Sequence, residues 1–265
     1  SELDTLIRLE QDIGARCPHI TRTYCIFQEP SRNFIVMEVM AGRTLTDLLH
    51  TKHTRLSERE TRRICIRLFE ALRFCHDRNI AHRDIKPCNL LLAESNNPES
   101  VKLADFGLAK YIPPREMLTT RCGTKAFLPP EIILSGTRVP GYHTQCDMWS
   151  AGVVIFKLLG GDMPFTSGQP NNDLITNIVS APPNYSNRNW ENVSDDAKAM
   201  IRNLLQRNPS ARMNPEEALN CDWMRADDAD LSHFSIDISL EGLIESAGWD
   251  HPAYDGPLPS EVFDV

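Results

Sequence analysis

The pattern of apolar and polar residues changes near residue 41. Before it, Thr23–Phe27 and Asn33–Val39 are rich in β-branched and aromatic residues and flank a Pro-containing turn, which predicts two strands. After it, apolar residues recur mostly at helical spacing. Leu90–Leu92 and Val101–Ala104 are exceptions, because each is a short apolar run beside a polar loop. Each is therefore predicted to be a buried strand.

Five helices are predicted from apolar periodicity and from the residues at their ends. They cover residues 1–16, Ser57 to about Asp77, Asp147–Leu159, a segment capped by Ser194, and a last helix that begins at Asn214-Pro215. Ser57–Glu60 has the form of a capping box, and Gly160-Gly161 follows the third helix as a stop signal. The part of the chain after residue 41 is thus expected to be mostly helical.

A polar run from His82 to Asn89 carries the candidate chemistry. It places the carboxylate of Asp84, the ammonium of Lys86 and the carboxamide of Asn89 close together in sequence, and Asp105-Phe106-Gly107 follows. A carboxylate can orient a hydroxyl, an ammonium can reach a phosphate, and carboxylate and amide oxygens suit Mg²⁺. These are the needs of phosphoryl transfer. An isolated Asp and Asn at this spacing is more typical of a surface turn.

The order of several motifs resembles that of the eukaryotic protein kinases. The run reads H-R-D-x-K-x-x-N, and Gly123-Thr124 and Pro129-Pro130-Glu131 follow Asp105-Phe106-Gly107. Lys86, two residues after Asp84, is the Ser/Thr kinase pattern. Aminoglycoside-type phosphotransferases also use an Asp/Asn pair with a later metal-binding Asp, but they lack the segment from Asp-Phe-Gly to Pro-Glu. The segment shapes resemble most the calcium/calmodulin-dependent and checkpoint-type kinases.

This resemblance implies an α+β, protein kinase-like fold. Residues 1–40 correspond to a partial, β-containing small lobe with a regulatory helix, two strands and the hinge (Ile35–Met40). Residues 41–225 correspond to a mostly helical large lobe, and residues 226–265 to an acidic C-terminal tail. The implied function is ATP-dependent phosphorylation of Ser or Thr in protein substrates, with ATP and Mg²⁺ as cofactors.

The resemblance also assigns roles to individual residues. Asp84, Lys86 and Asn89 are catalytic, and Asn89 and Asp105 hold the metal. Met37 is the gatekeeper of the nucleotide site, the backbone of Glu38 and Met40 binds adenine, and Leu91 forms its floor. The structural and regulatory positions are His82, Arg83, Phe106, Gly107, Thr119, Thr120, Thr124, Glu131, Asp147 and Arg212.

Three of these assignments predict specific contacts. Asp147 braces the backbone of the catalytic loop (His82–Asn89), Arg212 pairs with Glu131, and Thr124 bonds Asp84 and Lys86. Thr120 is the first candidate for regulatory phosphorylation by an upstream activating kinase, and Thr119 is the second. Arg83 is expected to pair with that phosphate.

Some parts of the family pattern are missing. No Gly-x-Gly-x-x-Gly and no Val-Ala-x-Lys strand occur, although these parts normally clamp the ATP phosphates. Arg8 stands where the family has Glu before the Pro18-His19-Ile20 turn. The chain is therefore either an N-terminally truncated kinase or a catalytically inert, kinase-like binding module. The intact Asp84, Asn89 and Asp105 favour the first alternative, and we expect the chain as given to be a poor catalyst.

Other departures concern substrate choice. Lys125, Phe127 and Pro129 replace the residues usual in the segment that faces the substrate. Cys88 and Thr44 stand where kinases that select basic substrates carry Glu. We therefore expect no strong demand for Arg upstream of the phosphoacceptor.

Composition narrows the class of protein further. The chain has 265 residues and a net charge of −8, and Ala226–Val265 contains ten acidic residues and no Lys or Arg. No basic stripe indicates a nucleic-acid partner, and the longest apolar run, near Gly152–Leu159, is too short to span a bilayer. The eight cysteines form no C-x-x-C pair, which favours reduced thiols in a cytoplasmic or nuclear protein.

Overall fold

The computed structural model describes residues 17–29, 32–51, 55–135, 141–167 and 173–226, which lie in one compact unit of the chain. The helix predicted for residues 1–16 and nearly all of the acidic tail lie outside the described residues.

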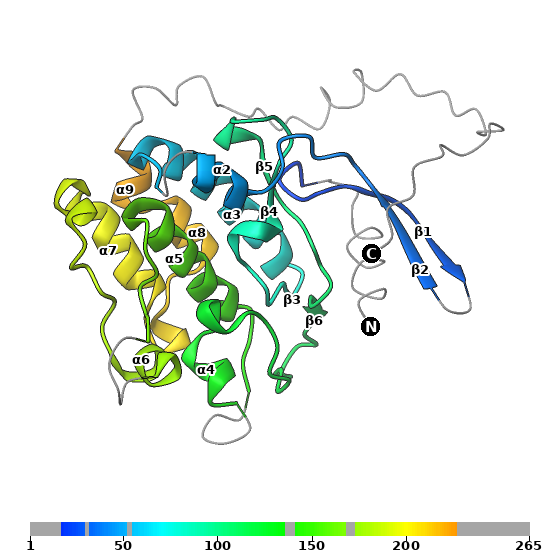
Figure 1. Ribbon diagram of the computed structural model, residues 1–265. Coiled ribbons are helices and arrows are strands. Elements are labelled where there is room, and N and C mark those ends of the chain that lie inside the picture. Colours follow the sequence, from blue (N-terminus) through cyan, green and yellow to red (C-terminus); the bar gives the residue numbers. More distant parts are fainter. Residues whose placement is uncertain (1–16, 30–31, 52–54, 136–140, 168–172, 227–265) are drawn as a thin grey trace. The chain divides into compact units, whose positions relative to one another are not determined.

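Most described elements after residue 44 are helices (Figure 1). The strands are β1 (Thr23–Glu29), β2 (Arg32–Met37), β3 (Ile80–Ala81), β4 (Leu90–Leu92), β5 (Val101–Leu103) and β6 (Lys110–Tyr111). The helices are α2 (Leu45–Thr51), α3 (Glu58–His76), α4 (Pro130–Ile133), α5 (Gln145–Gly160), α6 (Leu174–Ser180), α7 (Asp195–Leu204), α8 (Pro215–Leu219) and α9 (Asp222–Arg225). This arrangement confirms the predicted α+β, kinase-like fold class.

The strands form three separate two-stranded sheets. β1 and β2 make an antiparallel hairpin in which Phe27 lies opposite Phe34. β4 pairs antiparallel with β5, and Leu91 lies opposite Lys102. Flanking chain extends this second pair, because Ile20 bridges Leu103 in parallel and Thr44 bridges Leu91. The β4–β5 pair therefore joins the chain before the hairpin to the chain after it.

Two long helices, α3 and α5, lie at the centre of the described unit. The predicted capping box of α3 is confirmed, since Ser57 accepts a hydrogen bond from the Glu60 amide and Glu60 bonds the Ser57 amide. Helix α5 is buried on nearly all sides and ends at Gly161, whose φ of 85° is left-handed and favours glycine. The core between them includes the fully buried rings of Trp149, Phe69 and Phe156.

Two element ends differ from those predicted. The strand expected to reach Val39 ends at Met37, and the next amide, that of Glu38, bonds the Arg22 carbonyl at 2.9 Å. Asn214-Pro215 begins α8 with a capping box, but α8 is not the last helix. The chain turns at Asn220, and α9 follows because Trp223 packs into the core.

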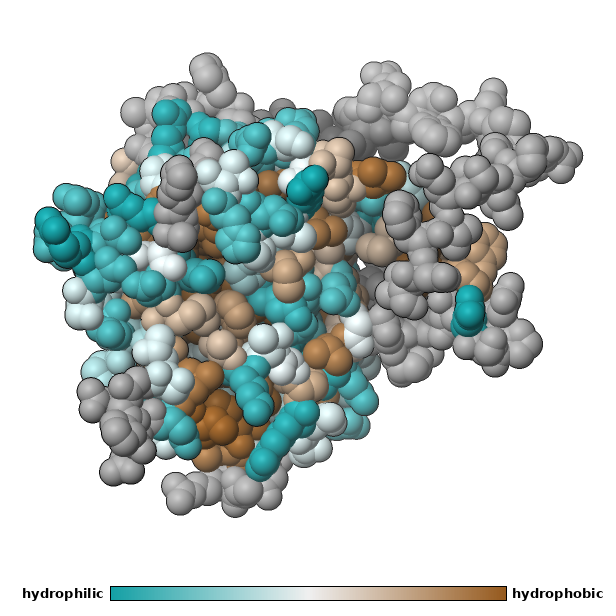
Figure 2. All heavy atoms as spheres, in the orientation of Figure 1, coloured by the Kyte–Doolittle hydropathy of each residue, from teal (hydrophilic) through white to brown (hydrophobic). Residues whose placement is uncertain are grey.

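Polar side chains cover most of the face shown in Figure 2, and an apolar area lies over α4 beside α6. All eight cysteines are free thiols. Within the described ranges, no helix is both long and apolar enough to cross a membrane.

Candidate active site

The backbone of the catalytic loop is held by the side chain of Asp147 of α5, which is fully buried. Its Oδ2 accepts a hydrogen bond from the His82 amide at 2.9 Å, and its Oδ1 accepts one from the Arg83 amide at 2.8 Å. His76 Nε2 lies 3.0 Å from Oδ2. Arg83 has a φ of 70°, a conformation that a non-glycine residue adopts at some cost, so these bonds hold a strained turn.

The same contacts decide the charge of Asp147. Burial alone raises the pKa of a carboxyl group, but the hydrogen bond and positive potential of His76 outweigh it here. The pKa of Asp147 is therefore lowered, and the side chain remains an anion beneath the loop.

His82 connects the catalytic loop to the residue before Asp105. Its ring is fully buried and meets Phe106 edge-on, with the ring centres 4.8 Å apart. Burial lowers the pKa of His82, so the ring is neutral. The Asp84 amide lies 3.3 Å from Nδ1, which must therefore be the acceptor, and Nε2–H donates to the Ala104 carbonyl at 3.0 Å.

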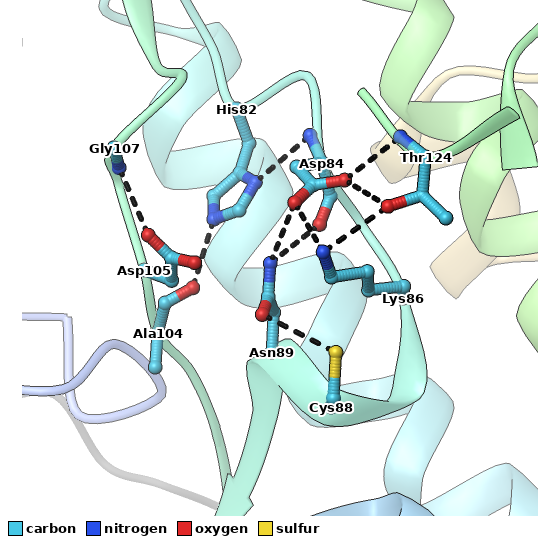
Figure 3. A network of polar contacts seen from close by, with 9 residues as sticks. All are labelled: His82, Asp84, Lys86, Cys88, Asn89, Ala104, Asp105, Gly107 and Thr124. Atoms are coloured by element: carbon cyan, nitrogen blue, oxygen red, sulfur yellow. Dashed lines mark hydrogen bonds and ion pairs between the residues drawn. The ribbon is translucent and has the colours of Figure 1, made fainter.

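Asp84 lies at the centre of the polar network in Figure 3. Lys86 Nζ lies 2.7 Å from Oδ2, and Asn89 Nδ2 lies 3.2 Å from the same oxygen. Oδ1 accepts hydrogen bonds from the amide and the hydroxyl of Thr124, at 3.2 and 3.0 Å. Two donors on each oxygen fill the usual acceptor capacity of a carboxylate. Lys86 also donates to the Thr124 hydroxyl at 3.1 Å, so both contacts predicted for Thr124 are present.

These donors also set the pKa of Asp84. Its partial burial raises the pKa, but the hydrogen bonds from Lys86 and Thr124 more than compensate, and the pKa is lowered. The pKa of Lys86 is raised, because its bond to Asp84 outweighs the effect of burial. The two groups are therefore an ion pair at neutral pH.

The two predicted metal ligands lie on adjoining segments. The Asn89 carbonyl accepts the Ala104 amide at 2.9 Å, which places Asn89 beside the residue that precedes Asp105. The Asn89 Nδ2 donates a hydrogen bond to the Asp84 carbonyl, and its Oδ1 faces the weak thiol donor of Cys88, 3.6 Å away (Figure 3). Asp105 is solvent-exposed, with a φ of 61°, and its Oδ1 accepts the Gly107 amide at 3.2 Å.

This donor set fits a magnesium ion. Asn89 offers an amide oxygen that meets only a weak donor, and Asp105 offers an exposed carboxylate; both are hard oxygen ligands. Among the described residues, no group of three His, Cys, Asp or Glu side chains could hold a metal. A site made by one carboxylate and one amide leaves most of the coordination shell to water or phosphate, as magnesium prefers.

The predicted nucleotide residues lie along the β4–β5 pair. Met37 ends β2, and the chain after it runs beside β4, where the Gly42 amide bonds the Leu92 carbonyl at 2.8 Å. A Cβ on Gly42 would lie 2.4 Å from the Glu94 carbonyl oxygen, so this close approach requires glycine. Leu91 of β4 is partly exposed. The Glu38 amide already bonds the Arg22 carbonyl, so of the two Glu38 backbone groups the carbonyl is the one left for the predicted adenine contact.

The activation segment, which runs from Asp105 to Glu131, is linked to Arg83 through Tyr142, a residue outside all the sequence motifs. Arg83 Nε donates to the Leu108 carbonyl at 2.5 Å, and its Nη1 lies 3.3 Å from the Tyr142 hydroxyl. That hydroxyl donates to the Thr120 carbonyl at 2.7 Å. Burial raises the pKa of Tyr142, which keeps the donor protonated. Thr119 and Thr120 are both exposed, so Thr120 is accessible and two hydrogen bonds away from Arg83.

Comparisons with known protein sequences identify the family of this chain. The family model for the protein kinase domain matches residues 4–224. The chain belongs to the protein kinase domain family. It is 35% identical over 243 residues to serine/threonine-protein kinase D3 of Mus musculus, covering 89% of this chain and 26% of that protein. It is 34% identical over 249 residues to serine/threonine-protein kinase D2 of Homo sapiens, covering 92% and 28%.

A more distant organism gives a similar match. The probable serine/threonine-protein kinase fhkD of Dictyostelium discoideum is 36% identical over 220 residues, covering 80% of this chain and 29% of that protein. The kinase domain described here spans about a quarter of the length of these relatives.

One further predicted contact of the kinase domain is present in its interior. Arg212 and Glu131 form a two-pronged ion pair, with N–O distances of 2.6 and 3.0 Å. Their side chains are 0% and 4% exposed. Arg212 also donates to the carbonyls of Gln145 and Gln206, so the guanidinium is well satisfied. The pair ties the end of the activation segment to the chain before α8.

Two residues near the site carried no recognisable signal in the sequence. Tyr142 lies in no motif, and its role depends on a fold that brings it to Arg83. Lys102 reads as an ordinary strand residue, but its ammonium bonds both carboxylate oxygens of Glu38, at 2.8 and 2.7 Å. Both contacts join residues far apart in sequence, which periodicity and spacing do not reveal.

Proposed function

We propose that this kinase domain catalyses ATP-dependent phosphorylation of Ser or Thr residues in protein substrates. The observation that carries the proposal is the ionised Asp84, held between Lys86 and Thr124 in a loop that also presents Asn89 beside Asp105. The family match and the Ser/Thr kinase names of the relatives support transfer over the inert alternative.

Asp84 is suited to orient the substrate hydroxyl. Its lowered pKa makes it a weak base, so its main task is to accept the hydroxyl hydrogen bond and align the oxygen for attack. Its two oxygens already receive four hydrogen bonds, so one donor must leave when substrate binds. We assign this step to Lys86, whose long and flexible side chain is partly exposed and can turn its charge toward the transferred phosphate.

ATP and Mg²⁺ are the cofactors generally used by this family. In this chain, Asn89 and Asp105 would hold the metal, which supplies charge neutralisation at the phosphates when bound. The Glu38 carbonyl and the Met40 backbone would bind adenine, with Leu91 beneath it and Met37 as gatekeeper.

Regulation, substrate preference and location are finer parts of the proposal. Thr120, exposed and close to Arg83, is the proposed site for an upstream kinase, with Thr119 second. Cys88 and Thr44 provide no carboxylate, so substrates need no upstream Arg. We also propose a cytoplasmic or nuclear protein, nearest the calcium/calmodulin-dependent and checkpoint-type kinases, on the basis of its free thiols and segment shapes.

The decisive experiment is Asp84→Ala in the full-length protein. We expect the transfer rate to a Ser/Thr peptide library to fall by about 10²–10⁴-fold, the range typical for loss of a positioned acid or base. Thermal stabilisation by Mg²⁺ and ATP should remain, because Asp84 is not a proposed ligand of either. Asp195→Ala, on the exposed start of α7, is the matched control. Retained transfer by Asp84→Ala would remove the proposed mechanism.

A further inference from the structure

The ion pair between Glu38 and Lys102 lies where the hinge meets the large lobe. Lys102 Nζ lies 2.8 and 2.7 Å from the two carboxylate oxygens, and the side chains are about one-fifth exposed. Glu38 Oε1 also accepts the Arg22 amide at 2.6 Å, while the Glu38 amide donates to the Arg22 carbonyl. The Glu38 side chain is thus bonded to segments on both sides of the hinge.

Lys102 lies on the large-lobe side of this ion pair, in a well-buried strand. It lies in β5 between Val101 and Leu103, whose side chains are almost completely buried. Directly opposite it in the strand pair is Leu91, the proposed floor of the adenine site. Asp105, the proposed metal ligand, follows three residues after Lys102, just beyond the end of β5 at Leu103. The strand therefore holds the backbone of Lys102 in a defined position relative to the residues proposed for both ends of the nucleotide.

Glu38 lies on the hinge side of the ion pair, where the neighbouring chain is more exposed to solvent. It follows the β1–β2 hairpin, on which Tyr24, Phe27 and Val36 are exposed. Its backbone carbonyl is the group left to accept a hydrogen bond from adenine, because its amide is already bonded. The contact between the Glu38 side chain and Lys102 therefore fixes the direction of the Glu38 backbone carbonyl, which is only a few bonds away.

We propose that Lys102 is a positioning residue for the nucleotide, acting through Glu38 as a latch that holds the hinge against β5. The inference rests on the proposed function. The latch sets the distance between the hinge carbonyl above the nucleotide and the Leu91 floor below it. It touches neither the phosphates nor the hydroxyl acceptor, so it acts on nucleotide binding and leaves the transfer step unchanged.

The test is a double-mutant cycle in the full-length protein with Lys102→Met and Glu38→Gln. Methionine keeps an unbranched side chain without the charge, and glutamine keeps an acceptor for the Arg22 amide. We expect each single variant to raise KM for ATP by about two- to fivefold, the range of a partly exposed ion pair, with kcat unchanged. The double variant should equal the larger single effect, since either change removes the same ion pair.

A second readout does not depend on activity. Without nucleotide, amide hydrogen exchange of the Glu38–Met40 segment should accelerate in Lys102→Met by a similar factor. Lys198→Met is the matched control, because it also removes a lysine from a partly exposed pair, with Asp195 on α7, and should change neither readout.

The possible outcomes separate the latch from the proposed function. Unchanged KM and unchanged exchange in an active protein overturn the latch alone, as do additive effects in the double variant or a fall in kcat at constant KM. A wild-type protein that neither binds nor uses MgATP overturns the proposed function and the positioning role together. A raised KM with faster hinge exchange, absent in Lys198→Met, supports the latch.

Discussion

The catalytic loop and the hinge are both held by charged side chains, but at different depths. Asp147 under the loop is fully buried, and it accepts two backbone amides and one imidazole. The Glu38–Lys102 pair at the hinge is partly exposed and joins β5 to the chain that follows β2. A buried anion that accepts three hydrogen bonds is held in one geometry. A partly hydrated ion pair can separate at a small cost in free energy.

This difference matches the two tasks proposed for the site. In-line transfer depends on placement of the reacting groups, and a misplacement of about 1 Å can cost as much as 10²-fold in rate. Asp84, Asn89 and the residues that carry them are therefore attached to the buried framework. Nucleotides must enter and leave, so the hinge side is held by contacts of lower energy. The predictions below test this contrast, in order of decreasing effect.

The largest effect is expected for Asp147→Ala. The change leaves the amides of His82 and Arg83 and the His76 ring without an acceptor in the interior. At about 1–3 kcal/mol for each unsatisfied donor, partly relieved by relaxation, we expect a loss of roughly 3–5 kcal/mol in unfolding free energy. Urea denaturation followed by circular dichroism measures this loss. A loss no larger than that of Asp195→Ala would mean that the loop is not anchored through Asp147.

A slightly smaller effect is expected for Arg212→Met. Methionine fills similar volume but leaves Glu131 buried and unpaired, which costs about 3 kcal/mol or somewhat more. The double variant Glu131→Leu/Arg212→Met should recover part of this loss, because it removes the isolated charge. Urea denaturation of the three proteins measures both steps. A double variant less stable than Arg212→Met would contradict this account.

The sequence was informative wherever function and local geometry coincide. Asp84, Lys86, Asn89 and Thr124 were selected from short motifs, and the structure brings them into one network. Capping signals at Ser57 and Ser194 placed the starts of α3 and α7, since a cap acts over only three residues.

What the sequence could not provide depends on contacts between distant segments. Lys102 and Glu38 are 64 residues apart, and Tyr142 lies 59 residues from Arg83. Neither contact produces a periodic pattern or a local motif in the sequence. The short helix α9 was missed for a similar reason: only the packing of Trp223, whose indole donates to Glu58 at 2.7 Å, shows why the chain turns there.

The buried carboxylates of the catalytic framework also predict how the unfolding free energy falls at acid pH. The pKa values of Asp84 and Asp147 are lower in the folded protein than the ordinary value of about 3.9. Their contribution is therefore complete above that value and is lost as pH falls through the lower, folded values. Asp147→Asn should flatten the fall of unfolding free energy below about pH 5 relative to wild type, as measured by urea titrations at each pH. Parallel curves for the two proteins would assign the acid limb to other carboxylates.

The smallest effects are expected when the same substitution, valine to alanine, is made in the buried core and beside the hinge. Val154 in α5 is fully buried, and Val39 beside the hinge is 88% exposed. Truncation of a buried valine to alanine removes two methyl groups and leaves a cavity, so Val154→Ala should cost about 2 kcal/mol. Val39→Ala removes atoms that already face solvent and should change the unfolding free energy by less than about 0.5 kcal/mol. Paired thermal and urea unfolding measures both. Equal losses would mean that the hinge chain is as enclosed as the core, and the proposed division between a buried catalytic framework and an adjustable nucleotide side would then fail.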